Sequence, residues 1–292
     1  AKTEILDVVL DGSEPVIANF TIENEFTYSP MKEVRYTITD NVAIKSVKIT
    51  SNSAVHGGNT FLLTDKQTTY EDFVTITDMG SYTLTVTDFA GHTVTKNFEV
   101  YYIDTSPPTV TLDVSSPETY EESKFLNWTA YDDGEIVSCS LTDESGTSLF
   151  SGTSSSDCSS GTYDVQSNGR YIFTATDSVG NISMKDVEVT SLDKEYPSLH
   201  IMNVTPDEMG NVSIEITAND DAGIAKIVYR VDGPAGSSSY EDPGGGLGGT
   251  YYYTFNGLSS GPYTLFVEVT DVGGHMVSDT SSFEITGSSM PW

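Results

Sequence analysis

The chain has 292 residues, with 43 acidic against 13 basic side chains and a formal charge of −30. This balance argues against binding to nucleic acids or to anionic membrane surfaces, because the chain has few cations to neutralise phosphates. Tyr, Thr, Val and Ile are abundant whereas Ala, Leu and Lys are sparse, which favours strands over helices. The acidic excess is typical either of a hydrated, salt-adapted surface or of clustered carboxylates that hold divalent cations.

Residues 1–14 carry a short apolar run at positions 5–10 ahead of Pro15. This run predicts a strand-like N-terminal extension with three open roles: addition to the sheet edge of a neighbouring subunit, pairing within its own domain, or a frayed terminus. A first domain is expected over residues 15–104, where short stretches of alternating apolar residues are separated by turn signals. We expect its strands at residues 16–23, 33–40, 44–50, 61–65, 72–78, 82–87 and 93–104.

A second domain is expected over residues 105–193, after a proline-marked linker. We expect its strands at residues 109–114, 124–131, 135–143, 162–165, 171–176 and 184–190. Cys139 lies in the third of these strands and Cys158 in the Ser/Gly-rich stretch that follows. A single pair of cysteines favours one disulfide in an oxidising compartment over two reduced thiols. Such a bridge would stabilise the domain by roughly 3 kcal/mol in the chain-entropy model.

A third domain is expected over residues 194–292. We expect its strands at residues 198–204, 212–220, 224–232, 250–255, 265–270 and 281–286. The glycine-rich segment 243–249 has the composition of a flexible hairpin tip, and no helix is expected after it, so a phosphate-binding loop is unsupported.

One pattern occurs once in each domain, as YTLTVTDFAGH at residues 82–92, YIFTATDSVGN at 171–181 and LFVEVTDVGGH at 265–275. Each copy is a half-buried strand ended by an Asp-x-x-Gly turn, and the spacing indicates three tandem domains. Together with the proline-marked starts, it resembles the immunoglobulin-like repeats of prokaryotic cell-surface, surface-layer and extracellular filament proteins. The predicted fold class is therefore all-β, with three tandem immunoglobulin-like β-sandwich domains in an extended rod.

Carboxylates gather at the end of each predicted sandwich where the chain arrives and where two strand-connecting loops meet. The candidates are Asp11, Glu14, Asp40 and Asp88; Asp104, Asp132, Asp133 and Asp177; and Asp193, Glu195, Asp220, Asp221 and Asp271. Carboxylates on flexible loops are ligands that Ca2+ prefers, so these sets predict calcium sites that stiffen the linkers. The alternative for Asp88, Asp177 and Asp271 is a turn role, in which each bonds its own backbone.

Five Asn-x-Ser/Thr sequons indicate an exported, glycosylated chain, and Ala1 is typical of a residue left by a cleaved signal peptide. The sequons are Asn19, Asn127, Asn181, Asn203 and Asn211. No enzyme is expected, because the sequence has no nucleophile elbow, zincin motif or zinc-spaced Cys/His cluster. His56, His92, His200 and His275 are expected on loops or strand surfaces. Tyr251–Tyr253 are candidates for a sugar-binding surface, although strand alternation puts one or two of them in the core.

We therefore expect an extracellular structural protein: a subunit of a filament or surface layer that self-associates by strand addition, with no membrane span. The alternative is an adhesin stalk or a glycan- or ligand-binding segment of a larger cell-surface protein.

Overall fold

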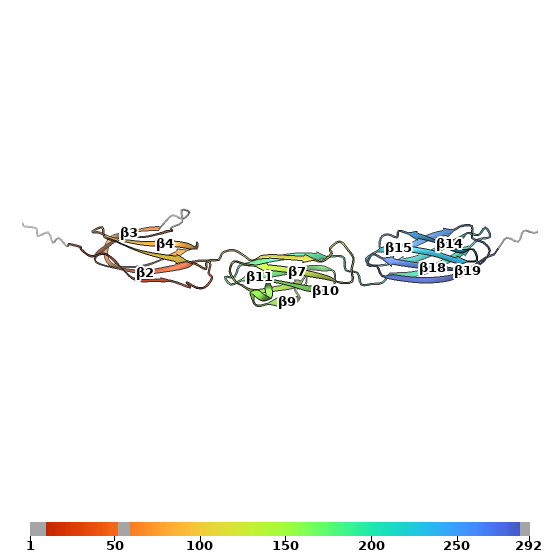
Figure 1. Cartoon of the computed structure of the whole chain (residues 1–292), viewed down its shortest axis with the longest axis horizontal. Helices are drawn as coiled ribbons and strands as arrows, with labels where there is room; N and C mark the ends of the chain where they lie inside the picture. The colour runs from red at the N-terminus through yellow and green to blue at the C-terminus, as the bar shows by residue number, and fades with distance from the viewer. Residues whose placement is uncertain (1–9, 52–58, 287–292) are drawn as a thin grey trace, which may run out of the picture.

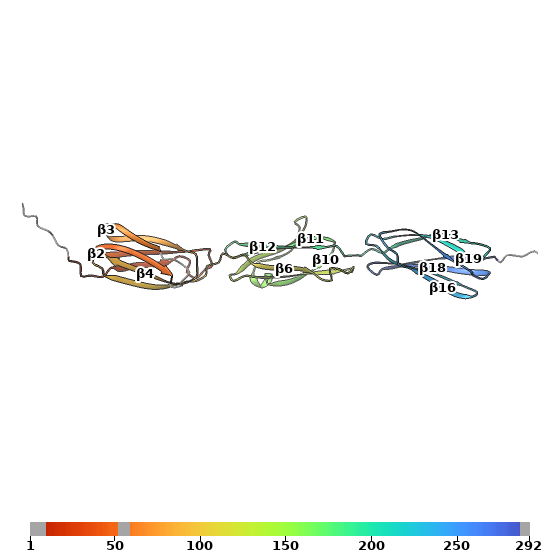
Figure 2. The same cartoon turned by 90° about the horizontal axis from the view of Figure 1, so that it is seen from above.

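The computed structural model describes residues 10–51 and 59–286. His56 and residues 5–9 of the predicted N-terminal run therefore lie outside the described residues. Three β-sandwich domains follow one another in a row, coloured red to orange, yellow to green and cyan to blue in Figures 1 and 2. The predicted all-β fold class is confirmed. In the described part of the chain, no helix is long and apolar enough to cross a membrane.

The middle domain shows the sandwich in its simplest form. One sheet has the strand order β10-β7-β6 and the other has the order β12-β11-β8-β9, with antiparallel pairing throughout. Its elements are β6 (Thr109–Val114), β7 (Lys124–Tyr131), β8 (Ile136–Asp143), β9 (Ser148–Gly152), α1 (Ser155–Cys158), β10 (Ser160–Val165), β11 (Gly169–Asp177) and β12 (Ile182–Val189).

The third domain repeats this topology, with sheets ordered β13-β14-β17 and β16-β15-β18-β19. Its strands are β13 (Ser198–Pro206), β14 (Val212–Asn219), β15 (Ile224–Gly233), β16 (Gly236–Asp242), β17 (Gly248–Phe255), β18 (Gly261–Asp271) and β19 (Met276–Ile285). In the second and third domains, the repeated sequence pattern begins in the strand that pairs with both the third and the last strand of the domain.

The first domain has fewer, longer strands, because two strands bend sharply and one continuous five-stranded sheet folds over on itself. Its strands are β1 (Val16–Ile22), β2 (Lys32–Ser51), β3 (Asn59–Ile76), β4 (Gly80–Asp88) and β5 (Thr93–Val100). The expected turn at residues 40–43 is part of β2, so the prediction of two strands there is wrong. A register shift between Thr39 and Ile44 marks the bend, where the Asp40 carboxylate accepts backbone N–H groups from Val42 and Ala43.

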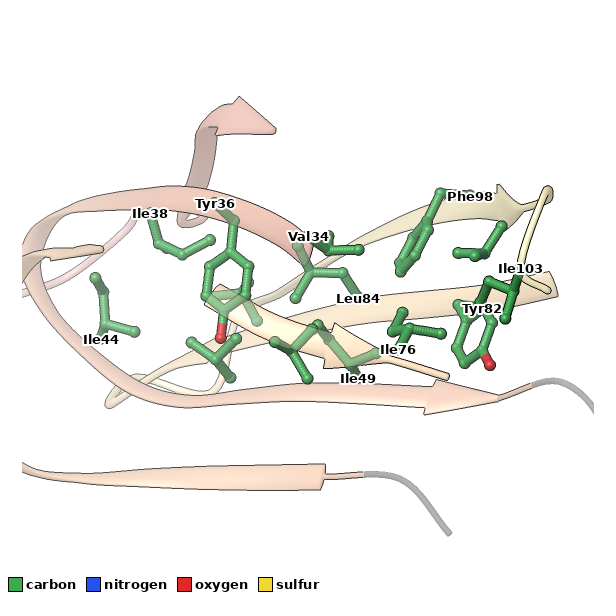
Figure 3. Packing of buried hydrophobic residues seen from close by; sticks show 14 residues of the cluster. Val34, Tyr36, Ile38, Ile44, Ile49, Ile76, Tyr82, Leu84, Phe98 and Ile103 are labelled. Atoms are coloured by element: carbon green, nitrogen blue, oxygen red, sulfur yellow. The ribbon is translucent and has the colours of Figure 1, made fainter. Parts of the chain in front are cut away.

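Each domain has a core made by the inward-facing residues of both sheets. In the first domain, Tyr36 and Leu84 point into the space between the ribbons, and Phe98 lies near Tyr82 (Figure 3). Alternation is strict in β4, where Leu84 and Val86 are fully buried while the threonines between them are partly exposed. This period-two pattern is what the sequence repeats predicted.

The predicted disulfide is confirmed. Cys139 on β8 is bonded to Cys158 in the helical turn α1, with the two Cα atoms 5.7 Å apart. Both cysteines are buried in the middle core. The bridge therefore ties the connection between β9 and β10 to the sheet that contains β8.

The prediction of a hairpin tip at residues 243–249 is wrong, because β16 and β17 belong to different sheets. The segment instead packs against the loop that follows β14. The Gly246 carbonyl accepts the Ile224 N–H, and the Leu247 carbonyl accepts the Asp220 N–H. Gly248 has φ +114°, and a Cβ there would lie 2.2 Å from the Ala218 carbonyl oxygen, so this close approach requires glycine.

Two fully buried lysines shape the loops at the opposite, downstream ends of the first two domains. Lys124 donates from Nζ to the carbonyl oxygens of Ser116 and Thr119 at 2.5 and 2.6 Å. Lys32 makes the equivalent bonds to Asn24 and Thr27. A buried charge is tolerated only when it is hydrogen-bonded, so each lysine holds its loop in one shape. These loops receive the linkers to the following domains.

Candidate metal centres at the domain joints

Three aspartate positions recur at the upstream end of each domain, where the chain arrives. The linker aspartates are Asp11, Asp104 and Asp193, each four residues before a buried proline. The second-strand aspartates are Asp40, Asp132 and Asp220, and the turn aspartates are Asp88, Asp177 and Asp271. They come from three distant parts of each domain sequence, and the sandwich topology brings them to one end.

In the middle domain, all three positions meet. Asp104, Asp132 and Asp177 each offer a carboxylate oxygen within 4.8 Å of the others. Asp104 is 5% and Asp177 1% exposed. The Oδ2 atom of Asp104 is buried and has no hydrogen-bond partner among the described residues. A Cβ on Gly134 would lie 2.6 Å from this atom, so glycine is needed beside the cluster.

The charges of this middle cluster repel one another. Burial, and then the neighbouring negative charges of Asp104 and Asp177, raise the pKa of Asp132 above its ordinary value, although the Gly134 N–H opposes this. Carboxylates at this spacing destabilise one another, and a cation among them would relieve the repulsion.

In the third domain, Asp193 belongs to two clusters, one with Asp220 and Asp221 and the other with Asp271 and His275. Asp193 is 3% exposed, and neither of its carboxylate oxygens has a hydrogen-bond partner in the described part of the chain. Burial, followed by the charges of Asp271 and Asp220, raises the pKa of Asp193. A buried carboxylate with so few partners among other negative charges has ligand atoms to offer a cation.

His275 is 7% exposed, so the expectation of a loop-surface histidine is wrong for this residue. Its Nδ1 lies 3.1 Å from Asp271 Oδ2, and its Nε2 lies 3.1 Å from Oε1 of Glu122, which belongs to the middle domain. The Tyr196 ring packs on the imidazole, with ring centroids 4.7 Å apart. Burial would lower the pKa of His275, but the bond to Glu122 and the charge of Asp271 outweigh burial and raise the pKa.

The first domain has a looser version of the arrangement. Asp11, Asp88 and His92 form one cluster, and His92 Nδ1 lies 2.7 Å from Asp88 Oδ2. Asp40 is not part of this cluster. Asp40 Oδ1 holds two backbone N–H groups, while its buried Oδ2 has no partner among the described residues.

The turn role considered for Asp88, Asp177 and Asp271 is present in the structure. In each case Oδ1 accepts the N–H of the residue four positions later. The second oxygen faces the side chain of that same residue, which is His92, Asn181 or His275. The turn therefore fixes the carboxylate, and its position in the cluster leaves it available to a cation as well.

Several other candidates lie outside the clusters. Glu14, Asp133 and Glu195 are exposed and join none of the groups found in the described residues. The sequon Asn181 is engaged within the structure, since its Nδ2 donates to Asp177 Oδ2 and to the Ser106 carbonyl. Of the tyrosines at 251–253, only the second is exposed, at 68%. The sequons Asn19, Asn127 and Asn203 are exposed, and Asn211 is partly buried.

The backbone next to two of the linker aspartates, Asp104 and Asp193, is bound to the preceding domain. Ile103 pairs with Ser29 in an isolated parallel bridge, and the Asp104 N–H donates to the Ser29 carbonyl at 3.0 Å. At the second joint, Leu192 pairs with Glu121, whose carbonyl accepts the Asp193 N–H at 3.1 Å. Ser29 and Glu121 lie in or beside the loops that the buried lysines shape. Asp104 and Asp193 thus each have their backbone on one domain and their carboxylate in the next.

The donor sets differ between the joints. The first joint offers carboxylate oxygens with Asn181 beside them, and this set fits calcium or magnesium. The second joint offers an oxygen-only set around Asp220 and a mixed set that contains His275.

Sequence reasoning missed His92, Asn181, His275 and Glu122 as neighbours of the clusters. The signal for the first three was present, because the repeated pattern ends in His, Asn and His directly after its glycine. Glu122 had no such signal, since it reaches the cluster from a different domain.

No protein-family model and no curated protein matches the chain. Among solved structures, it is similar to a tetra-tandem repeat in the extending region of a large adhesion protein, with 18% identity, a TM-score of 0.36, and coverage of 91% of this chain and 73% of that one. It is also similar to a structure from a 1.5-MDa bacterial ice-binding adhesin, with 14% identity, a TM-score of 0.40, and coverage of 94% and 98%. A third is a Ca2+-stabilised, ice-binding adhesin of an Antarctic bacterium, with 16% identity, a TM-score of 0.35, and coverage of 94% and 75%.

Proposed function

We propose that this chain is a non-enzymatic spacer segment of an extracellular, cell-surface protein. Its three sandwiches hold a ligand-carrying part away from the surface, and divalent cations at the joints set the angle between successive domains. Calcium is the ion proposed for the oxygen-only clusters.

One observation carries this proposal: a single linker residue is bonded through its backbone to one domain, while its carboxylate lies in the next. The Asp104 N–H is held by Ser29 of the first domain, while the Asp104 carboxylate lies among Asp132 and Asp177 of the second. A cation bound to these three carboxylates would therefore connect the two domains through a single residue. The same holds for Asp193 at the second joint.

Calcium suits the first joint for chemical reasons. It takes six to eight oxygen ligands at roughly 2.3–2.6 Å, and waters or carbonyl groups complete what the carboxylates leave open. The buried, unpartnered Oδ2 of Asp104 supplies a ligand that has no other bonding role in the described residues. A cation would also remove the mutual repulsion of the three charges.

The spacer is supported by the contacts at the joints, whereas no contact in the described residues bears on a self-assembling filament subunit. The filament hypothesis depends on strand addition by residues 1–10, of which 1–9 lie outside that part of the chain. One of the similar structures is an extending region of an adhesion protein, which agrees with the spacer, but the proposal depends on the joints. The disulfide agrees with an oxidising, extracellular location. Glycans on the exposed sequons are part of the same proposal.

The test is small-angle X-ray scattering of the purified chain, with calcium and with a chelator. We expect a single extended shape with calcium and a broader, shorter distribution of shapes with the chelator. The variant Asp177→Asn should behave like the chelated protein at the first joint, whereas the exposed control Asp113→Asn should not. The proposal is wrong if the parent chain scatters identically with calcium and with the chelator and both variants scatter like it, because cations then do not fix the angle between domains.

A further inference from the structure

The cluster of Asp193, Asp271 and His275 differs from the other joint clusters in holding a buried imidazole between the domains. All three residues are at least nine-tenths buried. Asp193 contributes two oxygens without hydrogen-bond partners among the described residues, so the cluster has free ligand atoms as well as charge. A Cβ on Gly273 would lie 2.6 Å from Asp193 Oδ2, so glycine is required for the linker carboxylate to approach this turn.

The distances fit a small ion. Zinc binds nitrogen and oxygen ligands at about 2.0–2.2 Å, so ligand atoms around one tetrahedral ion lie about 3.3–3.6 Å apart. His275 Nδ1 and Asp271 Oδ2 are 3.1 Å apart, and an Asp193 oxygen completes a group within 4.8 Å. A modest movement of Asp193 would close the set around one ion. The fourth position would be taken by water or by the second Asp193 oxygen.

The other ring nitrogen of His275 is already oriented by a carboxylate. Its Nε2 lies 3.1 Å from Glu122 Oε1, so Nε2–H can donate to Glu122 while Nδ1 binds the ion. Metal-binding histidines commonly use their second nitrogen in this way, which fixes the ring and makes the ligand more basic. Here the orienting carboxylate comes from the middle domain.

The equivalent positions in the other domains lack this combination. Asn181 replaces the histidine in the middle domain, and an amide is a ligand for hard ions such as calcium. His92 in the first domain faces Asp88, but its ring is 35% exposed, and no carboxylate binds its Nε2 in the described residues. Imidazole favours zinc and other transition metals over calcium.

We propose that Asp193, Asp271 and His275 form a zinc-class transition-metal site at the joint of the second and third domains, oriented across the joint by Glu122. The site rests on and deepens the proposed function, in which cations fix the joints, by adding a transition-metal site to the oxygen-only cluster of the second joint. When the ion binds, it takes the place of a proton on Nδ1, and Nε2–H stays bonded to Glu122.

The test is calorimetric titration of the full, metal-free chain with Zn2+ alone and with Ca2+ alone, followed by zinc-edge X-ray absorption. We expect a zinc site that calcium at equal concentration does not displace, with imidazole in its ligand shell. His275→Asn, which installs the amide found at position 181, should abolish this site. Glu122→Gln should weaken it by about 10–100-fold.

His92→Asn is the matched control, because it removes the more exposed histidine from the equivalent turn. It should leave the tight zinc site and its imidazole signal intact. The site is disproved if calcium displaces zinc from it, if His275→Asn binds zinc as well as the parent chain, or if His92→Asn removes the tight site. The calcium proposal is tested separately at the first joint, whose cluster has no histidine. Failure of the zinc proposal can therefore be distinguished from failure of the calcium proposal.

Discussion

The substitution Asp104→Asn should change the stability of the middle domain in opposite directions with and without calcium. In the parent chain, Asp104 lies within 4.8 Å of two other carboxylates. Each such pair repels by about 3.5 kcal/mol at an effective dielectric constant of about 20, and solvent around the partly exposed Asp132 reduces this. Asparagine keeps an oxygen for the Ser106 N–H and removes the charge. In chelator, we expect the substitution to raise the free energy of unfolding of the middle domain by about 1–2 kcal/mol. Each kcal/mol corresponds to a rise of roughly 4–8 °C in melting temperature.

With calcium the order should reverse. At about 1,000 times the dissociation constant, a bound ion stabilises the parent domain by about 4.1 kcal/mol. If loss of the charged ligand weakens binding by about 100-fold, the variant forfeits about 2.7 kcal/mol of this, more than the repulsion it relieves. Asp104→Asn should therefore melt above the parent chain in chelator and below it in calcium.

The assay is scanning calorimetry of the full chain, with the middle-domain transition identified as the one that moves on reduction of the disulfide. Asp113→Asn, an exposed charge change on β6, is the control and should leave that transition within about 0.5 kcal/mol under both conditions. An Asp104→Asn variant that melts below the parent chain in chelator would contradict the repulsion argument. Equal melting of the two chains in calcium would contradict ligation by Asp104.

Three further outcomes are expected. Reduction of Cys139–Cys158 should destabilise the middle domain by roughly 3 kcal/mol and leave the other transitions in place; a shift in all three would mean that the domains do not unfold separately. Lys124→Met should cost about 2–3 kcal/mol in denaturant unfolding, because two carbonyl groups lose their donor, whereas the exposed Lys185→Met should cost under about 0.5. In chelator, acidification should raise the stability of the third domain of the parent chain relative to that of the Asp193→Asn variant, because folding raises the pKa of Asp193. The stability gained by protonating Asp193 is complete below the ordinary aspartate pKa, near 3.9, and is lost as pH rises through the raised pKa. A relative stability that falls on acidification would refute this.

Strand alternation and the Asp-x-x-Gly turns predicted the sandwich fold and the gathering of aspartates, because both depend on local sequence and on a topology shared by the repeats. The same reasoning failed where sheets exchange strands. The sequence pattern of residues 32–51 predicted two strands joined by a turn. In the structure these residues form one strand that bends at Asp40 and stays in the same sheet. Segment 243–249 read as a hairpin tip, although its glycines carry the chain between the two sheets.

The sites were predicted least well where domains meet. The carboxylates at Asp104, Asp132 and Asp177 follow from one domain's topology, so sequence positions sufficed to bring them together. Glu122 reaches His275 only because a linker of a certain length sets one domain on the next. The burial of His275 depends on the same contact, and no local pattern in the sequence encodes it.

The joints also explain why bound ions would matter for the shape of this chain. Side-chain contacts between neighbouring domains are few in the described residues. At the first joint, the Tyr28 hydroxyl donates to the Asp133 carbonyl. At the second, Glu122 meets His275, and Lys194 donates to Gln166. Contacts of this size do not by themselves prevent domains from moving relative to one another. The linker, by contrast, is held to the upstream domain through Ile103 and, with an ion bound, to the downstream domain through the next residue. Since adjacent linker residues are then fixed to different domains, the joint has almost no free chain in which to bend. Ion occupancy, rather than the area buried between domains, is therefore what should decide whether the row of sandwiches is stiff.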